Sequence, residues 1–457
     1  MVTEQTQNII EAFNIKIDGR WVHLSEDVIK NHPGGGVITQ YKNSDATHVF
    51  HAFHEGSAKA YKQIEFLKKH KAIEVTNDPT LCQKRKDVSE TNVAEYNLTV
   101  EQEVKMVNNF EKLRQRMHEY GLMDEDNAFY YRKSIDTLAI MLTSFVLQYY
   151  GWYILSSVML ALAFQQLGWL AHEYCHHQPS KNRTYNQFFG LFFANFCQGF
   201  SSDWWKNKHN THHAATNIVD HDTDIDLTPL LVLVPSQLKQ FQQPIEKLLL
   251  KVVPYQHLYY TMMLPLIRAS WTSQSIEYVF TETSSSYKQM RMNAFWEQAT
   301  IIAHWIWILL QLYCLPDLST RITYFIISQF LGGFLIGFVV TFNHNSVDKY
   351  PADSRLFNNF AAMHILTTRN MNPSPFTDWL WGGLNYQIEH HLFPTMPRSN
   401  LNKASKLVKR FCKENNLPYL CDDYITGYKE NLRQLENMAK QVLKNEMFSN
   451  DNTNNVS

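Results

Sequence analysis

Apolar residues gather in two pairs of long, almost uncharged segments. The first pair covers residues 134–150 and 152–171, which are joined by a single glycine and carry only Asp136 as a charge. The second pair covers residues 297–315 and 322–342, joined by PDLSTR. Each segment is close to the length of about 17–20 residues that a helix needs to cross a bilayer. The pattern predicts four transmembrane helices arranged as two hairpins.

The chain before and after these segments has the polar and apolar mixture of soluble structure. Residues 12–75 contain a strand-like FNIKIDGRWVHL, the turn HPGGG and helical segments, which predict a small domain. Residues 76–133 are charged and predict a linker and a packing helix, in which Thr99 and Gln102 form a capping box. Residues 401–457 predict C-terminal helices and a disordered tail. The apolar stripe expected on the packing helix is Val104, Phe110, Leu113 and Met117.

Composition agrees with a chain that is embedded only in part. A length of 457 residues indicates two or more structural units. The mean hydropathy of -0.33 is too polar for a chain that lies wholly in the membrane. Lys plus Arg (42) balances Asp plus Glu (43), so charge gives no indication of a nucleic-acid partner. The 28 Phe, 23 Tyr and 11 Trp suit membrane-interface belts, although a large soluble core would also use them.

Topology follows from the number of crossings. The first residues, MVTEQTQNII, lack the pattern of a secretory signal, so we expect a cytosolic N-terminus. An even number of spans then precedes every histidine-rich motif, which places all of them on the cytosolic side. The hairpin tips carry only Arg321, whereas residues 172–296 carry many Lys and Arg, as the positive-inside rule requires. The apolar stretch 186–200 is short, so we expect it to lie in the interface or to re-enter. A single span there, or at the apolar stretch 252–267, would reverse this topology.

Three histidine clusters lie far apart in the chain. HEYCHH begins at His172, HNTHH begins at His209, and QIEHH ends at His391. Imidazoles three or four residues apart share one face of a helix. Neutral imidazole is a good ligand for iron, copper, nickel and zinc. The clusters therefore predict one metal centre assembled from distant segments.

HEYCH also matches the H-E-x-x-H motif of zinc proteases, in which Glu173 would act as the base. A protease zinc needs one further ligand and an open position, and this chain offers HNTHH, QIEHH and FNHNS besides. Eight or nine histidines shared between two iron ions give four or five nitrogen ligands each, with room for dioxygen. Two irons therefore fit better than one zinc. Isolated histidines are expected to be structural: His70, His118, His221, His257, His304 and His364.

The turn HPGGG suggests a haem pocket. Pro33 and the glycines let the backbone approach a flat ligand, and His54 follows His32 by 22 residues. Two histidines facing each other across a cleft could ligate a haem iron; a plain turn with an exposed histidine is the alternative. The order WVHLSED, HPGG, DAT and FH resembles the cytochrome b5 family, which implies haem b held by His32 and His54. His48 and His51 are then surface residues.

The order of a b5 domain, H-x-x-x-H, H-x-x-H-H and Q-x-x-H-H resembles the membrane front-end fatty acid desaturases over nearly the whole chain. LGWLAHEYCHH, WWKNKHNTHHAATN and WGGLNYQIEHHLFPTMP are similar to the Δ6 members of that family. Gln387 marks the front-end class and is the expected catalytic residue, positioning substrate or a metal-bound water. The resemblance implies that two non-haem irons are held by His172, His176, His209, His212, His213, His344, His390 and His391.

Other polar residues near the clusters are candidates for supporting roles. Glu173 and His177 are expected to orient ligand imidazoles. The acidic run DHDTDID at 220–226 could orient the HNTHH ligands or form a solvated loop. Basic residues in 203–208 and Arg398 could meet the head group of a coenzyme A or phospholipid ester.

The resemblance implies a small α+β cytochrome b5-like haem domain followed by an all-α membrane desaturase domain over 134–400. That domain would have four transmembrane helices and a cytosolic histidine-box cap. The implied reaction is oxygen-dependent: it places a cis double bond between an existing double bond and the carboxyl end of a fatty acyl substrate.

The implied partners are dioxygen, NADH-cytochrome b5 reductase and a lipid membrane. The implied location is the endoplasmic reticulum membrane, in which the chain would be multi-pass. Δ5 or Δ8 regiochemistry is the nearest alternative. A membrane haem electron carrier with inert histidine clusters is the alternative from another class.

Overall fold

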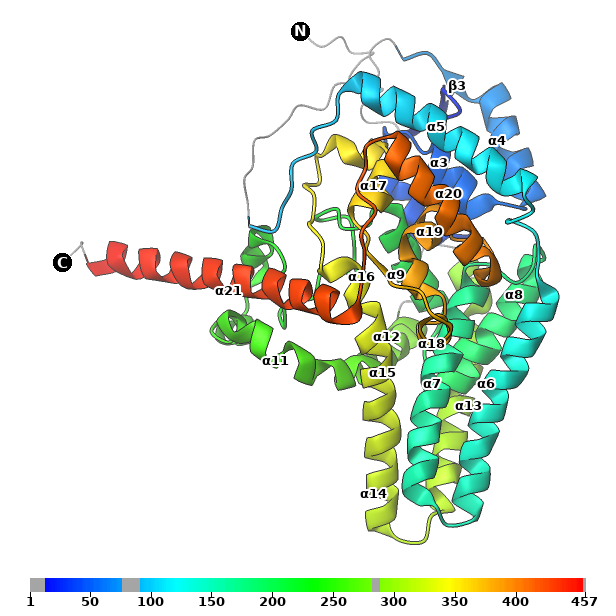
Figure 1. Cartoon of the computed structure of the whole chain (residues 1–457), viewed down its shortest axis with the longest axis vertical. Helices are drawn as coiled ribbons and strands as arrows, with labels where there is room; N and C mark the ends of the chain where they lie inside the picture. Colours follow the sequence, from blue (N-terminus) through cyan, green and yellow to red (C-terminus); the bar gives the residue numbers. More distant parts are fainter. Residues whose placement is uncertain (1–12, 76–90, 282–287, 455–457) are drawn as a thin grey trace.

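The structure is a computed structural model that describes residues 13–75, 91–281 and 288–454. The N-terminal residues 1–12 and residues 76–90 of the expected linker lie outside the described residues. Long helices lie side by side and extend away from the rest of the molecule (Figure 1). They are α6 (Asn127–Tyr149), α7 (Tyr153–Cys175), α13 (Lys288–Tyr313) and the continuous run α14 (Leu318–Ile326), η8 (Ile327–Leu331) and α15 (Gly332–Val340).

These helices cover the four segments expected to be spans, and the chain turns tightly between α6 and α7 at Gly151, whose φ is 79°. Two stretches are long and apolar enough to cross a membrane, Tyr153–Cys175 with mean hydropathy 1.5 and Leu318–Asn345 with 2.1. By the same criteria of length and apolarity, α6 and α13 do not qualify as spans. Both carry charged residues at their ends nearest the histidines, such as Lys133 in α6.

The N-terminal domain is a small sheet with helices, as the sequence predicts. Strands β1 (Asn14–Ile17), β2 (Arg20–His23) and β3 (Ala72–Ile73) form an antiparallel sheet in that order, with Ile15 opposite Val22 and Trp21 opposite Ile73. Three short helical elements precede a longer helix: α2 (Glu26–Lys30), η1 (Gly35–Tyr41), α3 (Thr47–His54) and α4 (Ala58–His70).

The expected packing helix is α5 (Val100–Glu119), and its capping box is present. The Thr99 hydroxyl accepts a hydrogen bond from the Gln102 backbone N–H, and the Gln102 side chain accepts one from the Thr99 backbone N–H. One member of the predicted stripe is wrong: Val104 is 56% exposed, and Met106 is buried instead. Spacing explains this, because Met106 lies four residues before Phe110 and shares its face.

One hydrophobic core joins parts of the chain that the sequence treated as separate segments. It contains Ile17 of the N-terminal sheet, Phe110 of α5, Met363 of α17 (Phe360–Leu366) and Val408 of α20 (Leu401–Glu414). The N-terminal domain is therefore packed against the histidine-bearing part of the chain. Figure 1 shows α5 and α20 beside the N-terminal elements at the end of the molecule opposite the helix hairpin turns.

Short helices fill the space between the bundle and this core. Residues 183–198 form α8 (Arg183–Gly190) and the π-helix η3 (Leu191–Gln198). The π-helix packs on α7 and α13 and ends at Gly199, which has a left-handed backbone conformation. The remaining elements named below are α9 (Ser202–Ala214), α16 (Phe342–Asn345) and α19 (Gln387–Leu392). The last helix, α21 (Tyr424–Asn454), extends well into the segment expected to be a tail.

Candidate metal centre

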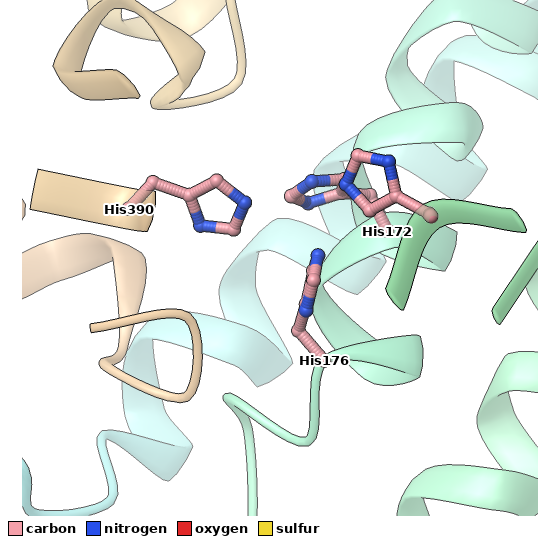
Figure 2. A group of neighbouring side chains, drawn as sticks. His172, His176 and His390 are labelled. Carbon is pink, nitrogen blue, oxygen red and sulfur yellow. The ribbon is translucent and has the colours of Figure 1, made fainter. Parts of the chain in front are cut away.

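The first group of histidines forms where α7, α9 and α19 meet. His172 lies in the last turn of α7 and His176 caps that helix, while His209 comes from α9 and His390 from α19. One ring nitrogen from each of these four residues lies within 4.8 Å of the others. Figure 2 shows His390 approaching His172 and His176 from the opposite side. We call this set the first cluster.

A second group lies beside it and consists of His212, His344 and His391, whose ring nitrogens also lie within 4.8 Å of one another. We call this set the second cluster. The amide nitrogen of Gln387 lies 3.1 Å from Nε2 of His344 and 3.3 Å from Nε2 of His391. Gln387 therefore faces the second cluster, from the position one helical turn before His391.

His213 lies between the two groups. Its Nε2 is 3.1 Å from Nε2 of His209, which belongs to the first cluster. Its ring stacks on that of His391 in the second cluster, with centroids 4.0 Å apart and an angle of 13°. All eight histidines expected to bind metal thus meet in one buried place, although they come from four separate helices.

The ring atoms of the first cluster fit a bound cation. Nε2 of His172, His176 and His390 is buried and has no hydrogen-bond partner in the structure. Burying several polar atoms without partners is costly, and a metal ion that accepts their lone pairs removes that cost. A site of imidazoles without carboxylate ligands suits iron, copper, nickel or zinc more than magnesium or calcium.

The opposite nitrogens of the second cluster are held by fixed acceptors. Nδ1 of His212 lies 3.0 and 2.9 Å from the two oxygens of Asp222, which is itself buried. Nδ1 of His344 donates to the carbonyl oxygen of Thr367 at 3.1 Å. These bonds direct both Nε2 atoms towards the cluster, as is usual for metal-binding histidines.

The acidic run at 220–226 therefore contains residues that contact the histidines as well as exposed ones. Asp222 holds His212, whereas Asp226 is exposed and accepts a hydrogen bond from Thr228. Asp224 is intermediate, with a carboxylate oxygen 3.6 Å from Nδ1 of His209. Asp222 thus has the orienting role predicted for this segment, whereas Asp226 belongs to a solvated loop, which was the alternative prediction.

Electrostatics favours the neutral, metal-binding form of most of these imidazoles. Burial, followed by the neighbouring imidazoles, lowers the pKa of His390 and His391 well below the usual value. For His212, burial lowers the pKa, but the adjacent Asp222 carboxylate outweighs it and the net pKa is raised. Asp222, with Asp224 further away at 3.8 Å, thus brings negative charge next to His212 of the second cluster.

Polar contacts fix the two short helices that present the histidines. The Ser201 hydroxyl accepts from the Trp204 N–H at the start of α9 and donates to Glu297 of α13 at 2.6 Å. In α19, Glu389 is fully buried and accepts hydrogen bonds from Asn370 and Tyr419, both at 2.8 Å. A six-residue helix is not stable alone, so these contacts hold His390 and His391 in place.

Two expected roles are wrong. Glu173 does not orient an imidazole, because its carboxylate pairs with Arg398 at 2.9 Å. The Arg398 side chain is only 8% exposed, so it is not available to a substrate head group. The same pair removes the base that a zinc protease would need, and His172 and His176 share their cluster with His209 and His390.

Several residues near the clusters were not singled out from the sequence. The Thr216 hydroxyl lies 3.1 Å from Nδ1 of His391 and 3.4 Å from Nδ1 of His364, a histidine expected to be merely structural. The Gln178 amide lies 3.3 Å from Nδ1 of His390. Gln178 directly follows HEYCHH in the sequence, so it could have been predicted to lie near the histidines. No pattern in the sequence indicates that Thr216 and His364 lie there.

The N-terminal domain contains a second place suited to a ligand. The rings of His32 and His54 are neighbours, with centroids 6.0 Å apart and planes inclined at 62° in an edge arrangement. Two metal–imidazole bonds of about 2 Å and two ring radii of roughly 1.2 Å span about 6.4 Å, which is close to this separation. Nδ1 of His32 lies 3.3 Å from the Gly35 carbonyl and Nδ1 of His54 lies 2.9 Å from that of Phe50, which leaves Nε2 of each for iron.

A cavity of about 770 Å³ surrounds His32 and His54 and continues to His176 and His177. We call it the haem cavity, after the ligand that the sequence predicts for it. Gly34 allows His32 its position, because a Cβ on residue 34 would come within 2.8 Å of the imidazole. His177, which has a positive φ of 60°, lies on this cavity and not in either cluster.

Comparison with known proteins agrees with this geometry. The pattern of the fatty acid desaturase family matches residues 150–422. The chain is 61% identical over 94% of its length, and 97% of the other protein, to the Delta(6)-fatty-acid desaturase fat-3 of Caenorhabditis elegans. It is 46% identical over 95% of its length, and 97% of the other protein, to the Delta(5) fatty acid desaturase fat-4 of the same organism. It is 33% identical over 86% of its length, and 88% of the other protein, to a Delta(8)-fatty-acid desaturase of Euglena gracilis. This chain belongs to the fatty acid desaturase family.

Proposed function

We propose that the protein is a front-end desaturase that places a cis double bond at the Δ6 position of linoleoyl and α-linolenoyl chains. The identity of 61% to a Δ6-named relative over nearly its full length carries the proposal. Δ5 action on a longer acyl chain is the second candidate, because a Δ5-named relative is 46% identical over a similar length. A Δ8-named relative at 33% gives less support for Δ8 action.

Two iron ions would be held by the eight histidines. His172, His176, His209, His213 and His390 would hold one, and His212, His344 and His391 would hold the other, with Gln387 beside it. When bound, iron supplies the dioxygen activation and one-electron chemistry that oxidise unactivated C–H bonds. The observation that supports metal here is the set of buried Nε2 atoms without hydrogen-bond partners.

The chain's own residues keep the site in order for this chemistry. Asp222 and the Thr367 carbonyl hold the protons on Nδ1 of His212 and His344, so both rings keep Nε2 free. Gln387 supplies an amide where an imidazole would otherwise complete the second cluster. An amide can donate to or accept from a water or substrate at that position. We therefore assign Gln387 a role in positioning.

The N-terminal domain would bind haem b through His32 and His54 and receive electrons from NADH-cytochrome b5 reductase. When bound, haem supplies electrons one at a time. Dioxygen accepts four electrons, two from the acyl C–H bonds and two from this donor, and with two protons from solvent leaves as two waters. The neighbouring imidazoles and the cavity around them support this assignment.

We propose that α6, α7, α13 and the run from α14 to α15 are four spans of the endoplasmic reticulum membrane. The N-terminus and both clusters would then lie in the cytosol. Two of these stretches have the apolarity of spans, and the other two pack alongside them (Figure 1). Carriage of the acyl chain on coenzyme A or on a phospholipid is compatible with this arrangement.

The function is tested by expression in a host that lacks polyunsaturated fats. Cells are fed either linoleic acid or dihomo-γ-linolenic acid, and mass spectrometry locates the new double bond. We expect γ-linolenic acid from the first feed and no product from the second. Product only from the second feed would replace Δ6 by Δ5.

Two variants test the metal site in the same host. His390→Ala should abolish product while the haem spectrum stays unchanged, and His70→Ala, an exposed imidazole outside both clusters, should retain activity. An iron count distinguishes the alternative class, because haem iron alone would indicate an electron carrier. Gln387→His should lose most activity while non-haem iron is retained; unchanged product would remove any special role of the amide.

A further inference from the structure

The haem cavity has two chemically different walls. The wall formed by the N-terminal domain is mostly apolar and includes Ile15, Leu24, Val49, Phe50 and Leu67. The opposite wall comes from the part of the chain that bears the histidine clusters, and it is polar. Its residues include Arg183, Thr184, Gln187, Lys206, Asn207 and Asn210.

Arg183 is the cation on this wall that lacks a negative partner. Its Nη2 donates to the Phe53 carbonyl oxygen at 2.8 Å, which ties it to the haem-binding helix α3. Within the described ranges, no carboxylate forms an ion pair with Arg183, and burial lowers the pKa of its guanidinium. Lys206, by contrast, is already paired with Asp203 at 2.6 Å. Arg183 thus has guanidinium donors left for a ligand in the cavity.

A haem is an amphiphile that matches these walls. Its macrocycle is apolar, and its two propionate carboxylates lie on one edge and are ionised at neutral pH. The apolar wall suits the macrocycle, whereas the guanidinium geometry suits a carboxylate through two parallel hydrogen bonds. We propose that Arg183 binds a haem propionate, so that the desaturase part of the chain completes the haem site. This inference rests on the proposed function, which includes haem.

Binding of a propionate by Arg183 would fix the orientation of the haem in the cavity. The haem cavity is also lined by His176, which belongs to the first cluster, and by His177. A propionate held by Arg183 keeps that edge of the haem on the cluster side of the cavity. Lys59 of the N-terminal domain lines the same cavity but is exposed, and it is the rival cation. A propionate at Lys59 would turn the edge towards solvent.

The experiment uses the full-length purified protein with haem. Arg183→Leu is compared with Lys181→Leu, which removes a cation two residues before the start of α8. Lys181 pairs with Asp124 and does not line the haem cavity. Haem transfer to apomyoglobin should be about tenfold faster for Arg183→Leu, as expected for loss of a charge-assisted hydrogen-bonded pair. The haem midpoint potential should fall, because a nearby positive charge favours the ferrous state. Arg183→Lys should restore part of both properties.

A second arm avoids any folding effect of the substitution. Wild-type protein reconstituted with haem dimethyl ester, whose propionates are blocked, should lose haem about as fast as Arg183→Leu with normal haem. With the ester, Arg183→Leu should add no further loss. Equal haem loss and potential in Arg183→Leu and Lys181→Leu would overturn the proposal, as would these effects in Lys59→Leu instead. A wild-type protein without a bis-histidine haem spectrum would instead overturn the haem assignment itself.

Discussion

Asp222→Asn provides the sharpest test of how the second cluster is held. Asp222 is 3% exposed, and both of its oxygens lie within 3.0 Å of Nδ1 of His212. The substitution keeps the size of the side chain and one oxygen that can accept from Nδ1. It removes the negative charge that polarises the imidazole towards a metal.

The size of the effect follows from these contacts. A hydrogen bond between an ionised and a neutral group contributes about 1.5–3 kcal/mol, and about 1.4 kcal/mol corresponds to tenfold in affinity. We expect iron at the second cluster to bind about 10–100-fold more weakly, the range found for such supporting residues. The Asp222 oxygens also accept from the backbone N–H groups of Asn217 and Asp224 at 2.7 and 2.8 Å. An amide NH₂ facing one of these donors should cost a further 1–3 kcal/mol, roughly, in stability.

Iron and haem are counted on the same purified sample after dialysis against a graded series of chelator. Wild type should keep iron at both clusters to a higher chelator concentration than Asp222→Asn, which should lose one of the two ions first. Asp226→Asn is the control, since it makes the same change at an exposed site in the same loop. Thermal unfolding in excess iron separates lost metal from lost stability. Equal iron retention in the two variants would refute the role given to Asp222.

Two glycine substitutions follow from close approaches in the structure. Gly34→Ala should weaken haem binding, because the new methyl group would lie 2.8 Å from Cε1 of His32; the Soret band per chain measures this, and full haem occupancy would contradict it. Gly333→Ala should destabilise the helix bundle by about 1–3 kcal/mol, because the methyl group would clash with the backbone carbonyl oxygen of Pro265. Detergent-solubilised thermal unfolding checks the second, with an unchanged midpoint as the contrary result.

Local patterns in the sequence gave reliable predictions where the cause was itself local. The capping box at Thr99 depends on two residues three apart, and the turn at Gly151 depends on one glycine. The histidines of α9 come together because a helix places residues 209 and 213 on one face. That the distant clusters meet at one centre followed from their shared chemistry.

Long-range contacts were beyond the same reasoning. Nothing near Glu173 in the sequence indicates its pairing with Arg398, which lies 225 residues away. Thr216 acquires its contact with His391 only when α9 and α19 pack together. The apolar residues of the N-terminal domain predicted a core, but not that this core would continue into α5 and α20. Such contacts depend on the relative placement of whole elements, which no local pattern encodes.

The shared core between the N-terminal domain and the histidine-bearing part has a kinetic consequence for the proposed electron transfer. A separate donor protein reaches its acceptor by collision, at a rate set by concentration, whereas a donor packed in place acts at a fixed effective concentration. Delivery to the metal centre then becomes first order and independent of enzyme abundance. Because the polar wall covers one side of the haem cavity, the proposed reductase would dock on another side. Electrons would enter and leave the haem by different edges. Both transfers could then occur while the N-terminal domain stays packed against the histidine-bearing part of the chain.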